Sequence, residues 1–162
     1  MAEYDLSFGV KLANTAALIV KDGVEELDAQ RTVLYLSLLS SEITLKALLE
    51  KAGKPIPEIR DRSHNLKGLL QDLGTCKVQV EIAPNKMKLC SAVGLRAVVV
   101  DPKFRNATVG TLLEAQDAGA SEYPNQIRYG DLLRHYPSEQ IAGMAREVTA
   151  WAKKYWDTIR IS

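Results

Sequence analysis

Two charged side chains, Glu42 and Lys46, lie on the apolar stripe of a long helical pattern in the first half of the chain. They are four residues apart, so at helical period they share one face. The rest of that face is large and apolar: Tyr35, Leu38, Leu39, Leu45 and Leu49. Because burying an unpaired charge is costly, both side chains are expected to be shielded and to have partners. A carboxylate and an ammonium in such a place could orient a histidine or hold a phosphate.

A histidine follows at the mouth of the next helical pattern. His64 comes just before the apolar stripe of Leu66, Leu69, Leu70 and Leu73, after a loop that contains two prolines. In the structural interpretation, its imidazole forms a hydrogen bond with the backbone or with Glu42. In the functional interpretation, it belongs to a polar pocket that uses the Glu42 carboxylate.

Three segments, in this order, resemble the HEPN family, whose name stands for a nucleotide-binding domain of higher eukaryotes and prokaryotes. The first is Ser41–Leu49 with the sequence SEITLKALL, and the second is Ser63–Leu66 followed by Leu69 and Leu70. The third is Tyr123–Gly130 with the sequence YPNQIRYG, which is similar to the Arg-Tyr turn before the family's last helix. Order and spacing together carry the resemblance, because each segment alone is short.

The resemblance implies an all-α, HEPN-like helical bundle formed as one domain by residues 1–162. It implies nucleotide or RNA binding in a bacterial defence, toxin–antitoxin or stress system. The expected partners are a second copy of the chain, in a two-fold homodimer, and a nucleotide, an RNA or a cognate antitoxin-like protein. A structural dimerisation module without catalysis is an alternative, because fold-level analogy is weak evidence for chemistry.

The resemblance also implies which side chains meet in a binding pocket. The members would be Glu42, Lys46, His64 and Arg128, with Tyr35 or Tyr129 as an aromatic wall. Glu42 would orient His64 or pair with Arg128. Lys46 and Arg128 would supply positive charge for a phosphate.

Catalytic members of the family are metal-independent ribonucleases that use an arginine and a histidine separated by four to six residues. Arg128 and His135 have six residues between them and are the candidate catalytic pair. The arginine could stabilise a phosphate while the histidine transfers protons. Gly130 and Pro137 bracket a stretch that favours a turn over a shared helix face, and Tyr129 stands where the family usually has a polar residue. We therefore expect no cleavage of bulk RNA and a buried, structural Arg128.

Composition limits the other possibilities. The chain has 162 residues and a formal net charge of +1, so it has no global field that would attract nucleic acid. Cys76 and Cys90 are far apart without a nearby histidine pair, so no metal site, cofactor or disulfide framework is expected. The start, MAEYDLSFG, lacks the pattern of a signal peptide, and no uninterrupted apolar run has the length of a membrane span. A cytoplasmic protein without a membrane partner is the expectation.

Hydrophobic periodicity predicts the helices that position these residues. Helices are expected at about 6–21, 28–53, 66–73 and 108–116, with a last helix that begins at Pro137 and runs to about Ile159. That last helix carries large apolar side chains: Trp151, Tyr155, Trp156 and Ile159. Since one face has little room to bury them all, self-association is predicted through an isologous interface.

The stretch 77–100 allows two interpretations. Residues 78–82 alternate apolar and polar side chains, and 96–101 is rich in β-branched residues, so both favour strands. Residues 85–93, between them, have a helical pattern. The prediction is an all-α core with a small two-stranded β insertion around 77–100. A helix from Pro84 to about Val99 is the alternative.

Overall fold

The computed structural model describes residues 1–103, 106–115, 123–128 and 137–161. Within these ranges the chain is mostly helical and has one small antiparallel sheet. The α-helices are α1 (Leu6–Asp22), α2 (Leu27–Ala52), α3 (Ile56–Asp61), α4 (Leu66–Gly74), α5 (Val109–Ala115), α7 (Tyr123–Arg128) and α8 (Ser138–Tyr155). The remaining elements are the strands β1 (Cys76–Ala83), β2 (Lys86–Ser91) and β3 (Arg160–Ile161), and the 3₁₀ helix η1 (Ala92–Ala97).

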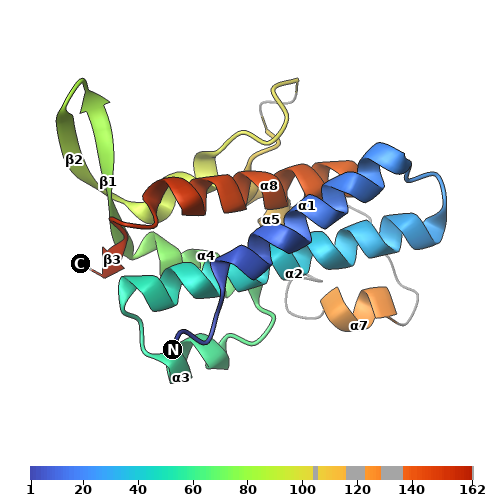
Figure 1. Cartoon of the computed structure of the whole chain (residues 1–162), viewed down its shortest axis with the longest axis horizontal. Coiled ribbons are helices and arrows are strands. Elements are labelled where there is room, and N and C mark those ends of the chain that lie inside the picture. The colour runs from blue at the N-terminus through green and yellow to red at the C-terminus, as the bar shows by residue number, and fades with distance from the viewer. Residues whose placement is uncertain (104–105, 116–122, 129–136, 162) are drawn as a thin grey trace.

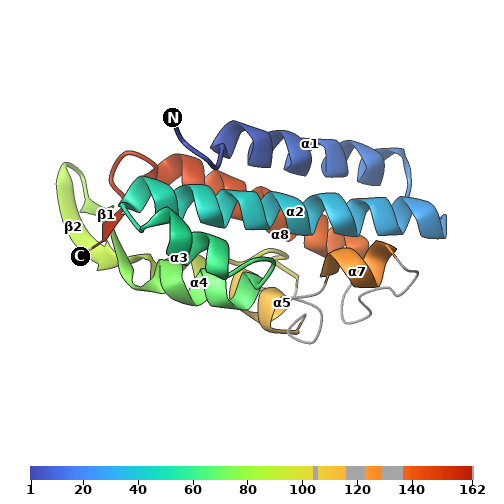
Figure 2. The same cartoon turned by 90° about the horizontal axis from the view of Figure 1, so that it is seen from below.

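Three long helices, α1, α2 and α8, lie side by side and form the body of the molecule (Figure 1). The shorter helices α3, α4, α5 and α7 lie on the side of α2 opposite α1 (Figure 2). As a result, α2 is covered on several sides, which explains why apolar and small polar residues of this helix are both buried. The five helices predicted from periodicity correspond to α1, α2, α4, α5 and α8.

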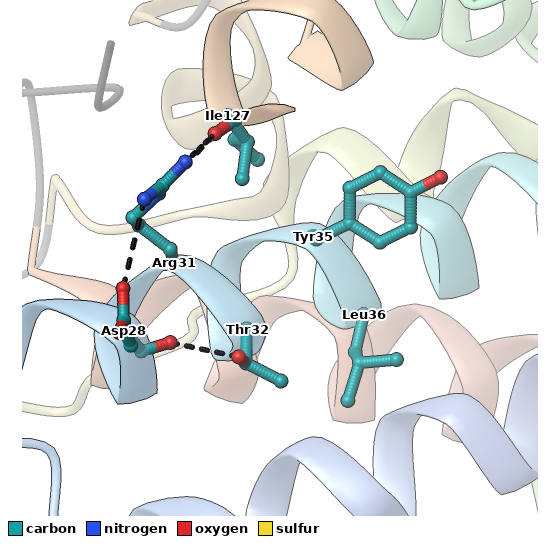
Figure 3. A pocket seen from close by; sticks show the side chains of 6 residues that line it. All are labelled: Asp28, Arg31, Thr32, Tyr35, Leu36 and Ile127. Carbon is teal, nitrogen blue, oxygen red and sulfur yellow. Dashed lines mark hydrogen bonds and ion pairs between the residues drawn. The ribbon is translucent and has the colours of Figure 1, made fainter. Parts of the chain in front are cut away.

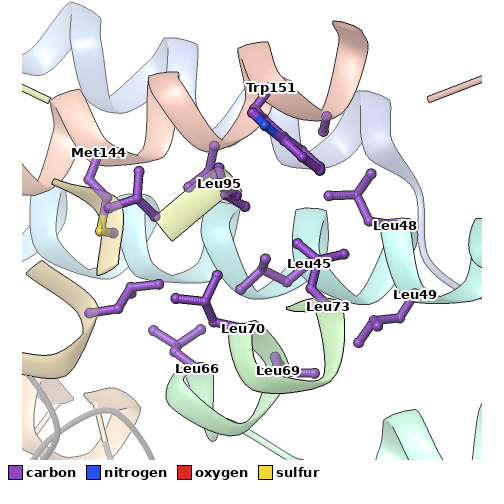
Figure 4. Close-up of a cluster of buried hydrophobic side chains, with 14 of the residues drawn as sticks. Leu45, Leu48, Leu49, Leu66, Leu69, Leu70, Leu73, Leu95, Met144 and Trp151 are labelled. Carbon is purple, nitrogen blue, oxygen red and sulfur yellow. The ribbon is translucent and has the colours of Figure 1, made fainter. Parts of the chain in front are cut away.

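The main hydrophobic core forms where α2 meets α4, η1 and α8 (Figure 4). Its fully buried members include leucines from α2 and α4: Leu45, Leu48, Leu49, Leu66, Leu69, Leu70 and Leu73. Leu95 of η1, and Met144 and Trp151 of α8, cover this leucine layer. Leucines at three- and four-residue spacing give α2 and α4 matching apolar faces, and burial of those faces fixes the position of α4 against α2.

The α1–α2 contact depends on small residues. Gly9 of α1 lies against Ser40 and Thr44 of α2, and a Cβ atom at Gly9 would overlap the Thr44 hydroxyl. The Ser40 hydroxyl donates a hydrogen bond to the Gly9 carbonyl at 2.6 Å. The small polar side chains Ser40 and Thr44 are therefore buried against α1, because small side chains allow two helices to approach closely.

The β insertion is confirmed in part, but its strands differ from the prediction. β1 is the alternating stretch, and it pairs antiparallel with β2 (Lys86–Ser91), a segment for which a helix was expected. Asn85 adopts a positive φ of 59°, and this left-handed residue closes the hairpin. The β-branched stretch 96–101 forms no second strand; residues 92–97 are 3₁₀ helix, and Val99 makes one isolated bridge to Thr108.

The sheet has a third strand that the sequence pattern did not indicate. β3 at the end of the described chain pairs with Cys76 and Lys77 at the start of β1, so the strand order is β2-β1-β3. The last helix therefore ends at Tyr155, a turn follows, and Ile159 is buried in the core. Trp151 is also buried and packs on the Tyr155 ring, so the apolar side chains of α8 contact the chain itself.

Two short helices were missed. Pro55 and Pro57 end the preceding helical pattern, as expected, but Pro57 then lies in the first turn of α3, where its missing N–H costs nothing. The Tyr123–Arg128 part of the segment predicted as a turn is the helix α7. Residue 116 of the predicted helix 108–116 lies outside the described residues, α5 accounts for residues 109–115, and Thr108 forms the bridge to Val99.

Among the described helices, α2 has the length and composition of a helix that could cross a membrane. Most of its apolar stretch, 72%, is buried inside the fold. Its apolar character is therefore accounted for by contacts with α1, α4 and α8.

Candidate functional site

The Glu42 carboxylate is the centre of a buried polar cluster, defined here as Glu42, Lys46, His64 and Tyr123. Glu42 is 3% exposed and lies in the middle of α2, where water cannot solvate its charge. Three donors replace the water. Lys46 Nζ lies 2.9 Å from Oε1, while His64 Nδ1 at 2.9 Å and the Tyr123 hydroxyl at 2.6 Å share Oε2.

Tyr123 supplies the most deeply buried of these donors. It opens α7 and has no exposed surface, and its hydroxyl donates to Glu42. Burial raises the pKa of the Tyr123 phenol above its usual range, and the nearby Glu42 charge raises it further. The phenol is therefore a permanent hydrogen-bond donor, which anchors α7 to α2 and keeps one lone pair of the carboxylate occupied.

Lys46 lies one turn after Glu42 and is 6% exposed. Its ammonium group forms the ion pair with Glu42 and lies 5.4 Å from the centre of the Tyr4 ring. Tyr4 belongs to the N-terminal arm, residues 1–5. The backbone N–H groups of Glu3 and Tyr4 donate to the Glu50 carboxylate, both at 2.9 Å. The arm thus covers the lysine side of the cluster.

A second contact holds the same arm. The Glu3 carboxylate accepts two hydrogen bonds from the Arg60 guanidinium of α3, at 2.8 and 2.7 Å. The hydrogen bonds from Arg60 lower the pKa of the Glu3 carboxyl. The arm is therefore tied to α2 through Glu50 and to α3 through Arg60, next to Lys46.

His64 is the member of the cluster that reaches the surface. Ser63 adopts a left-handed backbone with a φ of 47°, and Asn65 caps α4 by accepting the Gly68 N–H. This turn directs the imidazole towards α2, where Nδ1 contacts Glu42 and the ring lies edge-on to Tyr123 at 5.7 Å. The side chain remains 46% exposed. In the part of the chain that the structure describes, His64 Nε2 has no hydrogen-bond partner.

The carboxylate determines what His64 can do. A carboxylate accepts hydrogen bonds, so Nδ1 carries the proton and the surface nitrogen Nε2 is either a free lone pair or a second N–H. The Glu42–Lys46 pair has no net charge. A protonated His64 therefore gives the cluster one net positive charge, which is presented at Nε2. The Nε2 N–H can donate a hydrogen bond to a phosphate oxygen, and Nε2 can exchange a proton with a group placed beside it.

The predicted site residues divide into two groups. Glu42, Lys46 and His64 come together as expected, and Tyr35 lies next to them with its ring 6.2 Å from that of Tyr123. The backbone of Arg128 ends α7, but its side chain lies outside the described residues, and so do Tyr129 and His135. Among the residues that the structure describes, no group of three metal-binding side chains occurs.

Two contributors were not among the predicted site residues. Tyr123 was part of the third resembling segment, but nothing in its spacing links it to a carboxylate 81 residues earlier. Tyr4 covers Lys46 from the N-terminal arm, which has no periodic pattern.

No protein-family model, curated protein or solved structure matches the chain.

Proposed function

We propose that this chain is a HEPN-type helical domain that binds nucleotides or RNA in a bacterial defence, toxin–antitoxin or stress system. One observation carries the proposal: a buried carboxylate holds His64 by Nδ1, while the His64 side chain is 46% exposed. The order of the resembling segments supports the family. The meeting of Glu42, Lys46 and His64 supports the idea that these segments form one site.

The ligand group at His64 would be a phosphate. A protonated imidazole that is fixed by a carboxylate loses little conformational freedom on binding, so its hydrogen bond to an anionic oxygen is a charge-assisted one. The net charge of the chain is only +1, so affinity has to come from local contacts of this kind and not from a general basic surface.

A structural role of the cluster is the second candidate. It is favoured by the burial of Glu42, Lys46 and Tyr123, which connect α2 with α7 and with the turn before α4. Buried polar networks often serve only to fix packing. The two candidates differ in one respect: only ligand binding requires the exposed edge of His64.

The test compares two variants by fluorescence anisotropy with a short, fluorescein-labelled single-stranded RNA. His64→Asn keeps an amide near the position of Nδ1 but lacks the outward nitrogen. We expect its affinity to fall at least about tenfold, because a hydrogen bond to a charged group contributes roughly 1.5–3 kcal/mol. Lys88→Gln removes an exposed cation from β2, and is expected to bind like the wild type.

The outcomes separate the candidates. Equal binding by His64→Asn and the wild type, with both folded by circular dichroism, would leave only the structural role. Absence of RNA and nucleotide binding by the wild type would remove the proposal. Gel analysis of the same samples, with a metal chelator present, covers the alternative: cleavage that depends on Arg128 and His135 would make the protein a metal-independent ribonuclease.

The proposed setting is cytoplasmic, with a second copy of the chain as the first partner to test. The support for a homodimer is the family resemblance, since Trp151 and Ile159 are buried within the chain itself. Light scattering at tens of micromolar tests the dimer, and a monomeric mass would reject it.

A further inference from the structure

A cavity of about 340 Å³ lies between α2 and the end of α7, beside the Glu42 cluster. Figure 3 shows the side chains that line it: Asp28, Arg31, Thr32, Tyr35, Leu36 and Ile127. The volume is within the range of small-molecule sites, which is roughly 300–1,000 Å³. Half of these residues are apolar or aromatic, and the polar ones, Asp28, Arg31 and Thr32, lie near the start of α2.

Arg31 and Tyr35 both line the cavity and both carry planar groups. They are one turn apart on α2, so their side chains leave the helix about 6 Å apart along its axis, and in Figure 3 both rise from the same side of the helix below Ile127. The Arg31 guanidinium is fixed, because Nε and Nη2 both donate to the Ile127 carbonyl, at 3.2 and 2.6 Å. A fixed guanidinium and an aromatic ring are both groups on which a flat heterocycle can stack.

The charges at the cavity favour a base over a phosphate. Asp28 Oδ1 lies 3.6 Å from Arg31 Nη1, so the two charges compensate each other and the carboxylate repels an anion. The side chain of Asp28 is 89% exposed and can still accept hydrogen bonds from the ring or amino N–H groups of a nucleobase.

Aromatic rings connect the cavity to His64. The Tyr35 ring, which lines the cavity, is 6.2 Å from the Tyr123 ring, and that ring is 5.7 Å from the imidazole. Tyr35 and Glu42 are two helical turns apart, which is about 10 Å along α2. A ligand that uses both places must therefore extend along α2, as a polynucleotide strand does, with its base in one place and a neighbouring phosphate in the other.

We propose that the α2–α7 cavity binds one unstacked base of a single-stranded RNA whose backbone passes His64. This inference rests on the proposed function, because His64 supplies the phosphate contact, and it narrows the ligand from nucleotides in general to a strand. Duplex RNA cannot offer an unstacked base, so it should bind much more weakly than the single strand.

The cavity can be filled without disturbing the core. Thr32 lines it and is exposed, so Thr32→Trp should place a ring in the cavity, whereas Thr32→Ala leaves the cavity open. With the labelled single-stranded RNA, Thr32→Trp is expected to weaken binding at least about tenfold, in keeping with the loss of one stacked base. Thr32→Ala is expected to bind within about twofold of the wild type, since it removes no stacking surface.

A second measurement does not depend on a variant. The methyl resonances of Thr32, Leu36 and Ile127 should shift when unlabelled single-stranded RNA is added to the wild type, and duplex RNA of the same sequence should shift them much less. If the single strand leaves these resonances unchanged, or duplex RNA binds as tightly, the cavity inference is wrong.

The variants distinguish the two proposals. If His64→Asn weakens binding and Thr32→Trp does not, the cavity inference fails and the proposed function stands. If Thr32→Trp weakens binding and His64→Asn does not, the RNA does not use His64, the Glu42 cluster is structural, and the inference fails because its strand must pass His64. Loss of affinity in both variants supports both proposals, and a wild type that binds no RNA overturns both.

Discussion

Replacing Glu42 by glutamine is expected to lower the free energy of unfolding by about 3 kcal/mol. Breaking a buried ion pair leaves the partner charge without compensation, and typically costs about 3–5 kcal/mol. Exposure does not reduce this cost, since the side chains of Glu42 and Lys46 are only 4% and 8% exposed. The amide oxygen of glutamine can still accept one hydrogen bond, from Tyr123 or Lys46, and this recovers about 1 kcal/mol.

A double variant isolates the cause. Glu42→Gln combined with Lys46→Met removes the Lys46 ammonium, which has no partner charge in the single variant, and fills its place with an apolar side chain of similar length. Replacing both charges of a buried pair by packed neutral groups is often close to neutral. The double variant should therefore recover most of the stability that the single variant loses, although it has one more substitution.

Urea unfolding, followed by the fluorescence of Trp151 and Trp156, measures both free energies. In a chain of this size, about 3 kcal/mol corresponds to a fall of roughly 6–12 °C in Tm, so calorimetry provides a second reading. A single variant within 1 kcal/mol of the wild type would show that the pair is solvated. A double variant no more stable than the single one would show that the loss does not come from Lys46.

Three further predictions concern other parts of the fold. Alkaline stability should depend on Tyr123: its folded pKa is raised by burial, so the stabilising contribution is complete below the unfolded value of about 10 and falls above it by up to about 1.4 kcal/mol per pH unit. Tyr123→Phe should show a shallower alkaline loss in urea titrations, and equal slopes would contradict this. Iodoacetamide should alkylate Cys90 before Cys76, because burial raises the pKa of the Cys76 thiol and the thiolate is the reactive form; peptide mass spectrometry gives the order, and faster labelling of Cys76 would refute it. Gly9→Ala should cost about 1–3 kcal/mol through its overlap with the Thr44 hydroxyl. The partner change Thr44→Ala should restore most of that loss in thermal melts, and failure to do so would place the strain elsewhere.

The sequence predicted the elements in which buried and exposed positions alternate regularly along the helix or strand. The leucines of α4 and the apolar face of α8 repeat at helical spacing, and β1 alternates between buried and open sides at its base. Glu42 and Lys46 could be placed in a buried pair from the same logic, because charges on an apolar stripe need partners. Local periodicity was sufficient in these places.

The missed features depend on contacts between residues that are distant in sequence, or belong to a strand with both faces exposed to solvent. β2 projects with both faces mostly open, so the polar and apolar alternation of its first four residues, KMKL, corresponds to no alternation of burial. β3 is two residues long and exists because β1 offers a free edge. Tyr123 donates to a carboxylate 81 residues earlier, and a single sequence holds no signal for that pairing.

We expect the partners of the Glu42 carboxylate to join it at different times as the chain folds. They lie 4, 22 and 81 residues from it, and closing a longer loop costs more entropy. The contact to Tyr123 is therefore expected to form last, and until then Glu42 and Lys46 can stay hydrated. Substitutions at Tyr123 should then speed unfolding and leave the refolding rate nearly unchanged. On this view the cluster sets how long the native state persists, and has little influence on how quickly it is reached.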